Sequence, residues 1–460
     1  MTINPRTSEA YKLLHKGTLV FARAEQQGIR VDVTYAERKK KWLGHKIIKL
    51  EEQFKRTKFY RHWAHVNKKP NIYSNPQLAH FLYQVKKLTP AKLTITGQGS
   101  TDEESLLRLN IPELESLLEI RKLKKVRDTY LDAFIREQVN GYIHPFFNLN
   151  LVRTFRSSSD HPNFQNIPIR DKEAMRICRK ALYARPGHQL LEVDYSRLEV
   201  RIAACYHEDP TMLRYIHNPA SDMHKDMAEQ IFMIKLDRSN PEHNILRNAA
   251  KNGFVFPEFY GDYYKNCAEG LACHWGQLPH GTWKDGQGIP LNEGTLSDHL
   301  RQNNIKSLKS FTNHLKEIEY DFWNNRFPGY KRWKERWWRL YQKYGYVDLK
   351  TGFRCSGLMN RKEVTNYPIQ GAAFHCLLWS FIELDKVMRE EEWDTRLVGQ
   401  IHDSIVLDVN PEELNRVKTI VKKITCESLP KAWDWIIVPL DIKMDLYPVD
   451  GSWADKSESI

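Results

Sequence analysis

Two apolar stretches that each lead to an aspartate decide how this chain is interpreted. The first is Leu190-Leu191-Glu192-Val193-Asp194, which the helical pattern of residues 195–206 follows. The second is residues 396–409, two apolar runs around the tight turn His402-Asp403-Ser404. Such runs predict buried strands. Because helical stretches separate them, the sequence predicts an α+β fold in which strand ends present carboxylates.

Carboxylates held at strand ends suit one kind of chemistry. Phosphoryl transfer with two divalent ions needs carboxylates that bridge metals roughly 3.5–4 Å apart, and Asp194 and Asp403 are the candidate pair. Each also fits a structural role, as a helix cap for Asp194 and a turn residue for Asp403. Arg247 and Lys251 project from one helical face and suit a triphosphate, although such a pair alone is more often a solvated surface.

Composition agrees with a polyanionic partner. The 460 residues hold 70 Lys and Arg against 57 Asp and Glu, a net charge of +13. This length predicts two or three subdomains. The sequence has no apolar run of transmembrane length, and seven scattered cysteines fit reduced thiols. We therefore expect a cytoplasmic protein, in the host cytoplasm if its source is viral, with no membrane contact.

Six segments in order resemble the motifs of family A DNA polymerases, over about residues 25–448. Residues 194–201 resemble motif A, residues 247–261 resemble motif B of the fingers, and residues 400–404 resemble motif C. Three more are similar to the primer-template segment, the histidine before the fingers and the template-side motif: residues 156–168, 222–224 and 366–371. Six ordered motifs are far more specific than one. The resemblance implies a right-hand fold of thumb, palm and fingers with an antiparallel palm sheet.

The resemblance also implies how the chain is divided. The expected parts are an N-terminal lead-in (1–24), a thumb-like helical region (25–140), a first palm part (141–210), fingers (211–345) with a glycine-rich insertion at about 262–300, and a second palm part (346–460). Family members often carry a proofreading nuclease before the thumb, and we find no nuclease motif here. We therefore expect DNA synthesis without intrinsic 3′–5′ proofreading, with partners such as a separate exonuclease or other replication proteins.

Catalytic roles follow from the resemblance. Asp194 and Asp403 would bind two Mg²⁺ ions, with Mn²⁺ as an alternative, and the Tyr195 backbone carbonyl would be a further ligand. Lys251 would protonate the pyrophosphate leaving group. The reaction implied is nucleotidyl transfer from a dNTP to a primer 3′-hydroxyl.

Binding roles follow in the same way. Arg247, Lys251 and His224 would hold the triphosphate. Glu199 would fill the space of a ribose 2′-hydroxyl, with Tyr260 behind it and Phe256 stacked near the sugar or base. The predicted contacts with primer-template DNA, made in the minor groove, are Arg156, Gln165, Asn166, Asn366, Gln370 and His402.

Three features depart from the family pattern. Motif C usually continues with a glutamate, and Ser404 cannot serve as an anionic ligand. The spacing from Lys251 to Tyr260 is one residue longer than usual and contains Pro257, which removes an amide donor and favours a kink. The nucleotide-facing residue is then either Phe256 or Val255. The glycine-rich insertion has no counterpart in the family.

Two other functions compete with DNA synthesis. A single-subunit RNA polymerase shares the metal-binding aspartates and the lysine to Tyr-Gly pattern, but Glu199 and residues 165–168 argue against it. A catalytically silent primer-template binding protein is the other alternative. Retention of four residues argues against a silent protein: Asp194, Asp403, Lys251 and Arg247.

Overall fold

Antiparallel sheets among many helices confirm the α+β class in this computed structural model. The structure describes residues 5–94, 96–169, 171–237, 239–274, 286, 288–401 and 403–459. The chain divides into two units, which we name the sheet unit (1–46, 122–217 and 329–460) and the helical unit (47–121 and 218–328). The five-part division expected from the sequence stays a prediction.

All described strands belong to the sheet unit. They are β1 (Ile29–Val31), β2 (Tyr142–Ile143), β3 (Phe146–Asn148), β4 (Ser158–Asp160), β5 (Leu182–Tyr183), β6 (Gln189–Tyr195), β7 (Tyr346–Asp348), β8 (Arg354–Ser356), β9 (Arg396–Ile401), β10 (Ser404–Val409), β11 (Ile442–Leu446) and β12 (Glu458–Ser459). The largest sheet has the order β12-β11-β6-β10-β9 and is antiparallel. The predicted strands at 189–194, 396–401 and 405–409 are confirmed.

Burial along the central strands follows their apolar sequence. Every residue of β10 is buried, and so is every residue of β6 except Asp194. A strand that is covered on both faces typically has a nearly continuous apolar sequence. The one exposed position of β6 is therefore the one that carries a predicted metal-binding carboxylate.

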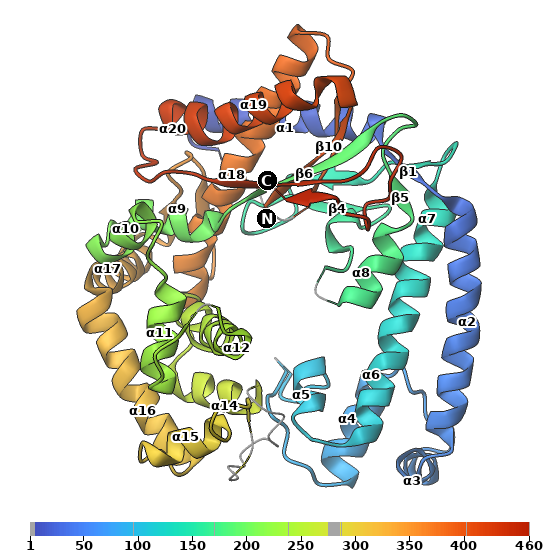
Figure 1. Ribbon diagram of the computed structural model, residues 1–460, viewed down its shortest axis with the longest axis vertical. Coiled ribbons are helices and arrows are strands. Elements are labelled where there is room, and N and C mark those ends of the chain that lie inside the picture. Colours follow the sequence, from blue (N-terminus) through green and yellow to red (C-terminus); the bar gives the residue numbers. More distant parts are fainter. Residues whose placement is uncertain are drawn as a thin grey trace. The chain divides into compact units, whose positions relative to one another are not determined.

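The sheet unit also contains many helices, several of which lie against its large sheet (Figure 1). They are α1 (Ser8–Gln27), η2 (Val126–Leu131), α7 (Asp132–Glu137), η3 (Phe164–Asn166), α8 (Lys172–Arg179), α9 (Leu198–His207), α10 (Pro210–His217), α17 (Pro328–Tyr344), α18 (Arg361–Glu390), η6 (Pro411–Glu413), α19 (Leu414–Lys422), η7 (Lys423–Ser428) and α20 (Leu429–Ala432). Helices α1 and α18 pack on β9 and on each other. They approach closely at Gly17, where a Cβ would lie 2.9 Å from Leu378 Cδ1.

The helical unit carries the motif B segment. Its elements are α3 (Lys58–Val66), α4 (Asn75–Ala79), η1 (His80–Val85), α5 (Glu103–Leu107), α11 (Met223–Phe232), α12 (Pro241–Ala250), η4 (Lys251–Val255), α13 (Phe256–Phe259), α14 (Tyr264–His274), α15 (Leu296–Gln302), α16 (Leu308–Asp321) and η5 (Phe322–Arg326). Helices α2 (Val33–Lys55) and α6 (Pro112–Lys125) run from one unit into the other. Of the expected insertion at about 262–300, residues 275–285 and 287 lie outside the described residues, and the described part carries α14 and the start of α15. Within the described part of the chain, no helix combines the length and apolar character needed to cross a membrane.

Candidate active site

The two predicted metal-binding aspartates lie at the same end of neighbouring strands. Asp194 is the last residue but one of β6, and Asp403 lies in the turn directly before β10. In the antiparallel register, Asp194 pairs with Ser404, and the Tyr195 amide donates to the Asp403 carbonyl at 3.2 Å. Strand pairing therefore brings the two aspartates together. Among the described residues, no group of three His, Cys, Asp or Glu side chains is placed to hold a metal.

The surroundings of Asp194 make its carboxyl group hard to ionise. Although the residue as a whole is exposed, desolvation by crowded neighbours raises the pKa of Asp194 to about 6, and the charges of Asp403 and Glu192 act in the same direction. A 2.9 Å hydrogen bond from Ser404 Oγ to Asp194 Oδ1 and the ammonium of Lys443 oppose this rise in pKa. Because a divalent cation relieves repulsion between carboxylates, this set of oxygen atoms suits a divalent cation.

Tyr195, the predicted source of a carbonyl ligand, is anchored on two sides. Its ring is buried, and its hydroxyl lies 2.7 Å from Ser380 Oγ of α18. On the other side, Tyr195 pairs with Ile442 of β11, and the following Ser196 amide donates to the Asp441 carbonyl at 2.8 Å. These contacts fix the backbone beside Asp194. The metal-ligand role of the carbonyl stays a prediction.

Arg156 and Glu199, to which the sequence assigned different tasks, bind each other. The left-handed backbone of Arg197 (φ 56°) turns the chain out of β6, so Glu199 lies in the first turn of α9. The Nη2 group of Arg156 donates to Oε1 of Glu199. The side chains are 33% and 18% exposed, so the pair is only partly open to solvent.

A buried polar cluster lies beside this ion pair. Ser157 Oγ donates to Gln400 Oε1 at 2.6 Å, and Gln165 Nε2 donates to Ser157 Oγ at 2.7 Å and also to Gln400 Oε1. All three side chains are buried, whereas Asn166 is exposed. The Gln165 side chain therefore bonds within the protein interior. A contact between this side chain and DNA would require its amide to exchange Ser157 and Gln400 for another partner. The primer-template roles of Gln165 and Asn166 stay predictions, and His402 lies outside the described residues.

The two predicted template contacts on α18 lie about one helical turn apart. Asn366 and Gln370 are partly exposed, whereas Thr365, Pro368 and Ile369 are buried. A spacing of four residues places both amides on one helix face. Helix α18 therefore presents them along one partly exposed stripe, as a contact with a nucleic-acid strand would require.

A π-helical turn takes up the extra residue of motif B. In η4 the Phe256 amide donates to the Lys251 carbonyl, five residues back, so this turn holds one residue more than an α-helical turn. Lys251 Nζ lies 5.2 Å from the Phe256 ring centroid, and the His224 ring meets Phe256 edge-on at 5.6 Å. Val255 is fully buried. Phe256, and not Val255, therefore contacts both Lys251 and the buried His224.

Arg247 is bound by a buried carboxylate that the sequence analysis did not single out. Its Nε and Nη2 groups donate to the two oxygens of Asp222 at 2.7 and 3.0 Å. Asp222 also begins α11 by accepting from the Lys225 amide at 3.2 Å. The bidentate pair thus joins α12 to α11, the helix that carries His224. The triphosphate role of Arg247 stays a prediction.

A second buried carboxylate supports motif B and was also missed. Glu258 is 1% exposed and accepts hydrogen bonds from Trp323 Nε1 at 2.8 Å and from the Cys267 thiol at 3.7 Å. It follows Pro257 in a short segment without a readable periodicity, so no sequence signal marked it. Tyr260, two residues further, is 43% exposed and remains accessible to a ligand.

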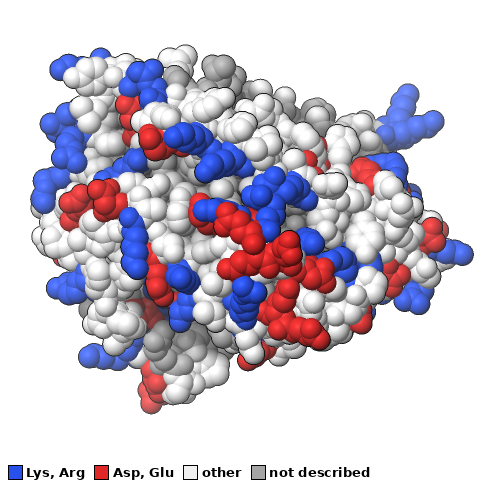
Figure 2. All heavy atoms as spheres, turned by 90° about the horizontal axis from the view of Figure 1, so that it is seen from above, with Lys and Arg blue, Asp and Glu red and all other residues white. Residues whose placement is uncertain are grey.

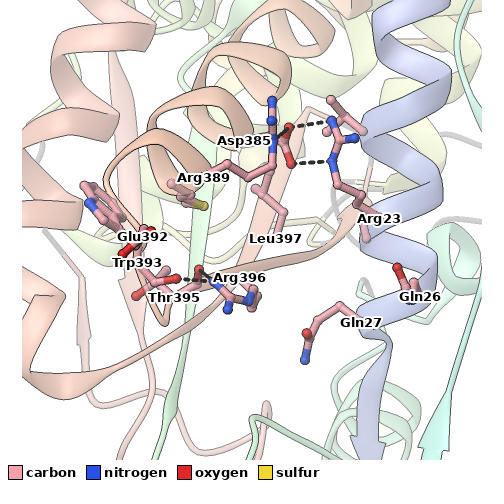
Figure 3. A pocket seen from close by; sticks show the side chains of 13 residues that line it. Arg23, Gln26, Gln27, Asp385, Arg389, Glu392, Trp393, Thr395, Arg396 and Leu397 are labelled. Carbon is pink, nitrogen blue, oxygen red and sulfur yellow. Dashed lines mark hydrogen bonds and ion pairs between the residues drawn. The ribbon is translucent and has the colours of Figure 1, made fainter.

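A pocket of about 630 Å³ lies at the end of β9 away from Asp403 (Figure 3). Its lining comes from α1, the last turns of α18 and the segment that enters β9. Asp385 accepts hydrogen bonds from Arg23 at 2.9 and 2.6 Å and from Arg389 at 3.0 Å. Roughly 20 Å of extended chain separates this pocket from Asp403. The pocket is therefore distinct from the aspartate pair.

Surface charge is mixed on the face that Figure 2 shows. Acidic side chains gather near the middle of this face, and lysines and arginines are spread around them. This face does not offer the continuous basic surface that a polyanion would favour.

Comparisons with known proteins agree with one another. The model of DNA polymerase family A matches residues 37–277 and 316–452. DNA polymerase I of Pseudomonas aeruginosa is 27% identical over 415 residues, 86% of this chain and 40% of that protein. DNA polymerase I of Lactococcus lactis subsp. cremoris is 30% identical over 387 residues, 81% of this chain and 38% of that protein. The chain thus spans about 40% of the length of these curated relatives.

A solved structure shares the fold. It is the POL domain of Pol1 from M. smegmatis in complex with DNA primer-template and dNTP. The TM-score is 0.73 at 24% sequence identity, and the match covers 96% of this chain and 70% of that one. This likeness confirms the fold class expected from the motifs.

Proposed function

This chain belongs to DNA polymerase family A, and we propose that it extends a DNA primer along a template by transferring dNTPs to the primer 3′-hydroxyl. The observation that carries the proposal is the position of Asp194 and Asp403 at adjacent strand ends of a buried antiparallel sheet. The POL domain with the same fold was solved with primer-template and dNTP, which supports the same substrates here. The family match favours neither a single-subunit RNA polymerase nor a silent binding protein.

Two divalent ions, Mg²⁺ or alternatively Mn²⁺, fit the aspartate pair. Asp194 and Asp403 provide anionic oxygens, and the Tyr195 carbonyl would add a neutral one. When bound, such ions activate the attacking hydroxyl and neutralise the leaving pyrophosphate. Ser404 provides a hydrogen bond to Asp194 in place of a third negative charge. We therefore expect a weaker hold on the ions than three carboxylates would give.

The cluster of Lys251, Phe256 and the buried His224 is the proposed nucleotide-binding part of the helical unit. Lys251 would attract the triphosphate and give a proton to the pyrophosphate. Phe256 would stack against the sugar or base. Arg247 would keep α11 and α12 together through Asp222, and it would reach a phosphate only by exchanging that partner.

The proposed primer-template contacts lie on three segments of the sheet unit. Arg156 and Asn166 precede β5, and Asn366 and Gln370 lie on α18. All four are at least partly exposed, so their amide and guanidinium groups are accessible to minor-groove acceptors. Glu199 would exclude a ribose 2′-hydroxyl from the incoming nucleotide.

Primer extension tests the proposal. The purified chain would be given a primer-template duplex and four dNTPs, with and without Mg²⁺, beside Asp194→Ala and the control Asp434→Ala, which alters an exposed aspartate of the same unit. We expect metal-dependent extension by the wild type and the control only. Duplex binding should survive in every variant, because phosphate contacts supply most of the affinity. Duplex binding without extension by the folded wild type would instead indicate a silent binding protein.

A further inference from the structure

We propose that Arg156 is a positioning residue that couples the pairing of the primer end to the selection of the sugar, by holding Glu199. The inference rests on the proposed function, because it concerns a primer end and a nucleotide sugar. It extends that function by giving Arg156 and Glu199 a shared task, whereas their sequence motifs indicate separate ones.

The backbone turn before Glu199 is fixed, and the Glu199 carboxylate accepts a hydrogen bond from Arg156. The Arg201 Nε group donates to the Ser196 carbonyl at 3.0 Å, which stabilises the turn between β6 and α9. A glutamate side chain has several rotatable bonds and loses considerable entropy when it is held in one rotamer. The hydrogen bond from Arg156 to the Glu199 carboxylate favours one orientation of the Glu199 side chain.

The backbone on both sides of Arg156 is clamped. Phe155 is 7% exposed, and its ring lies 5.5 Å from the Phe353 ring. Ser157 is bound to Gln400 of β9. The preceding Thr154 carbonyl lies so close to α18 that a Cβ on Gly371 would be 2.7 Å from its oxygen. Arg156 therefore reaches Glu199 from a fixed starting point.

The guanidinium group has the geometry to serve two acceptors at once. Arginine carries five N–H donors in a planar fork, and the contact with Glu199 uses Nη2. Other donors of the fork can bind the minor-groove acceptors that occupy the same place in every correct base pair. A mispair displaces these acceptors. Arg156 would then reorient, and Glu199 would be held less firmly against a ribose.

A purely structural ion pair would behave differently. A partly exposed pair contributes little to stability, and its loss would lower the melting temperature slightly without changing sugar preference. The ratio of dATP to ATP incorporation separates the two roles, because general loss of structure lowers both rates together. Rescue of this ratio by Arg156→Lys, which keeps the charge, would add a second distinction.

The experiment measures kcat/KM for dATP and ATP opposite template T, on primers with a paired and a mispaired end. The variants are Arg156→Gln, Arg156→Lys, Glu199→Gln and the double variant with glutamine at both positions. Arg153→Gln is the matched control, since Arg153 lies on the same segment and donates to the Leu358 carbonyl at 3.1 Å. We expect a mispaired end to lower the dATP preference of the wild type and of Arg153→Gln by at least about fivefold.

The Arg156→Gln variant should show the reduced preference for dATP over ATP on the paired as well as the mispaired primer end. Arg156→Lys should restore part of this preference on the paired end. The double variant should be no less selective than Glu199→Gln, because the two residues act through one contact. An unchanged preference in an active Arg156→Gln variant, or additive losses in the double variant, would overturn the inference. If the wild type fails to extend a paired primer with dATP, the proposed function itself fails.

Discussion

The β6–β10 pair and the motif B helix position their functional side chains by different rules. In the sheet, β10 and β11 flank β6 on both sides, and a shift of one residue would turn every side chain to the opposite face. In the helix, Lys251 and Phe256 share a surface because η4 takes up one extra residue. Position is thus enforced by neighbouring strands in the first region and by local winding in the second. We expect the helix to tolerate a change of length that the sheet would not.

The largest effect should come from the sheet. Asp403→Asn removes one of two negative charges while preserving the shape of the side chain. We expect kcat for extension to fall by about a thousandfold or more, since several kcal/mol of charge stabilisation are lost. Steady-state extension rates and thermal melting in the same buffer measure this. Asp434→Asn is the control, and a near-normal rate in Asp403→Asn would show that the strand ends do not carry the metals.

The second prediction alters the helix by single deletions. Deletion of the exposed Asn252 should convert the π turn into an α turn and leave Lys251 and Phe256 on one surface. Deletion of the exposed Asn248 should instead turn Lys251 by about 100° relative to Arg247. We expect kcat/KM for dNTPs to change by no more than a few-fold in the first variant and to fall on the order of a hundredfold in the second.

Both deletion variants need a check of folding, for which circular dichroism and duplex binding suffice. Equal losses in two folded variants would contradict the idea that the π turn alone absorbs the extra residue. The kcat/KM values of the two deletion variants measure how far helical winding can compensate for a change in the length of motif B.

Much of the sheet region could be predicted from the sequence. Apolar runs marked β6, β9 and β10. The carboxylate at the end of the first run and the one in the turn between the other two predicted that Asp194 and Asp403 lie close together, because strand pairing has few alternatives once its faces are buried.

The partners of the functional side chains could not be predicted. The Arg156–Glu199 contact joins residues 43 positions apart, and Arg247 reaches Asp222 across 25 positions. Such pairs depend on tertiary packing, which leaves no periodic trace in the sequence. The burial of Gln165 was missed for the same reason. The spacing of motif B revealed an extra residue, but it did not reveal which turn would take it up.

A smaller effect is expected at Ser404, where the sheet itself departs from the family pattern. Ser404→Glu should preserve activity and lower the half-saturating Mg²⁺ concentration by up to about tenfold, because it adds a negative ligand. Ser404→Ala should raise that concentration a few-fold, since it removes the hydrogen bond that holds Asp194. Extension at graded Mg²⁺ and calorimetric titration with Mn²⁺ measure both. A folded but inactive Ser404→Glu variant would show that this turn differs from the family's.

The smallest effect concerns the stability of the sheet unit in mild acid. Burial lowers the pKa of His207 and of His375 to about 3, from 6.5 in an unfolded chain. Both stay neutral when folded but take up protons when unfolded, so their stabilising contribution is complete above pH 6.5 and is lost as pH falls toward 3. Each should lower the free energy of unfolding by about 0.7 kcal/mol between pH 7 and pH 6.

Asp194 acts in the opposite direction, because its raised pKa lets the folded state bind a proton near pH 6. A net loss of roughly 1 kcal/mol is therefore expected. Urea unfolding in metal-free buffer at the two pH values measures it, and His375→Gln should remove about half of the histidine contribution. The control His15→Gln alters an exposed histidine and should keep the full dependence. An equal free energy of unfolding at pH 6 and pH 7 would show that His207 and His375 take up protons in the folded state. The sheet unit would then be less rigidly closed than its strand register implies.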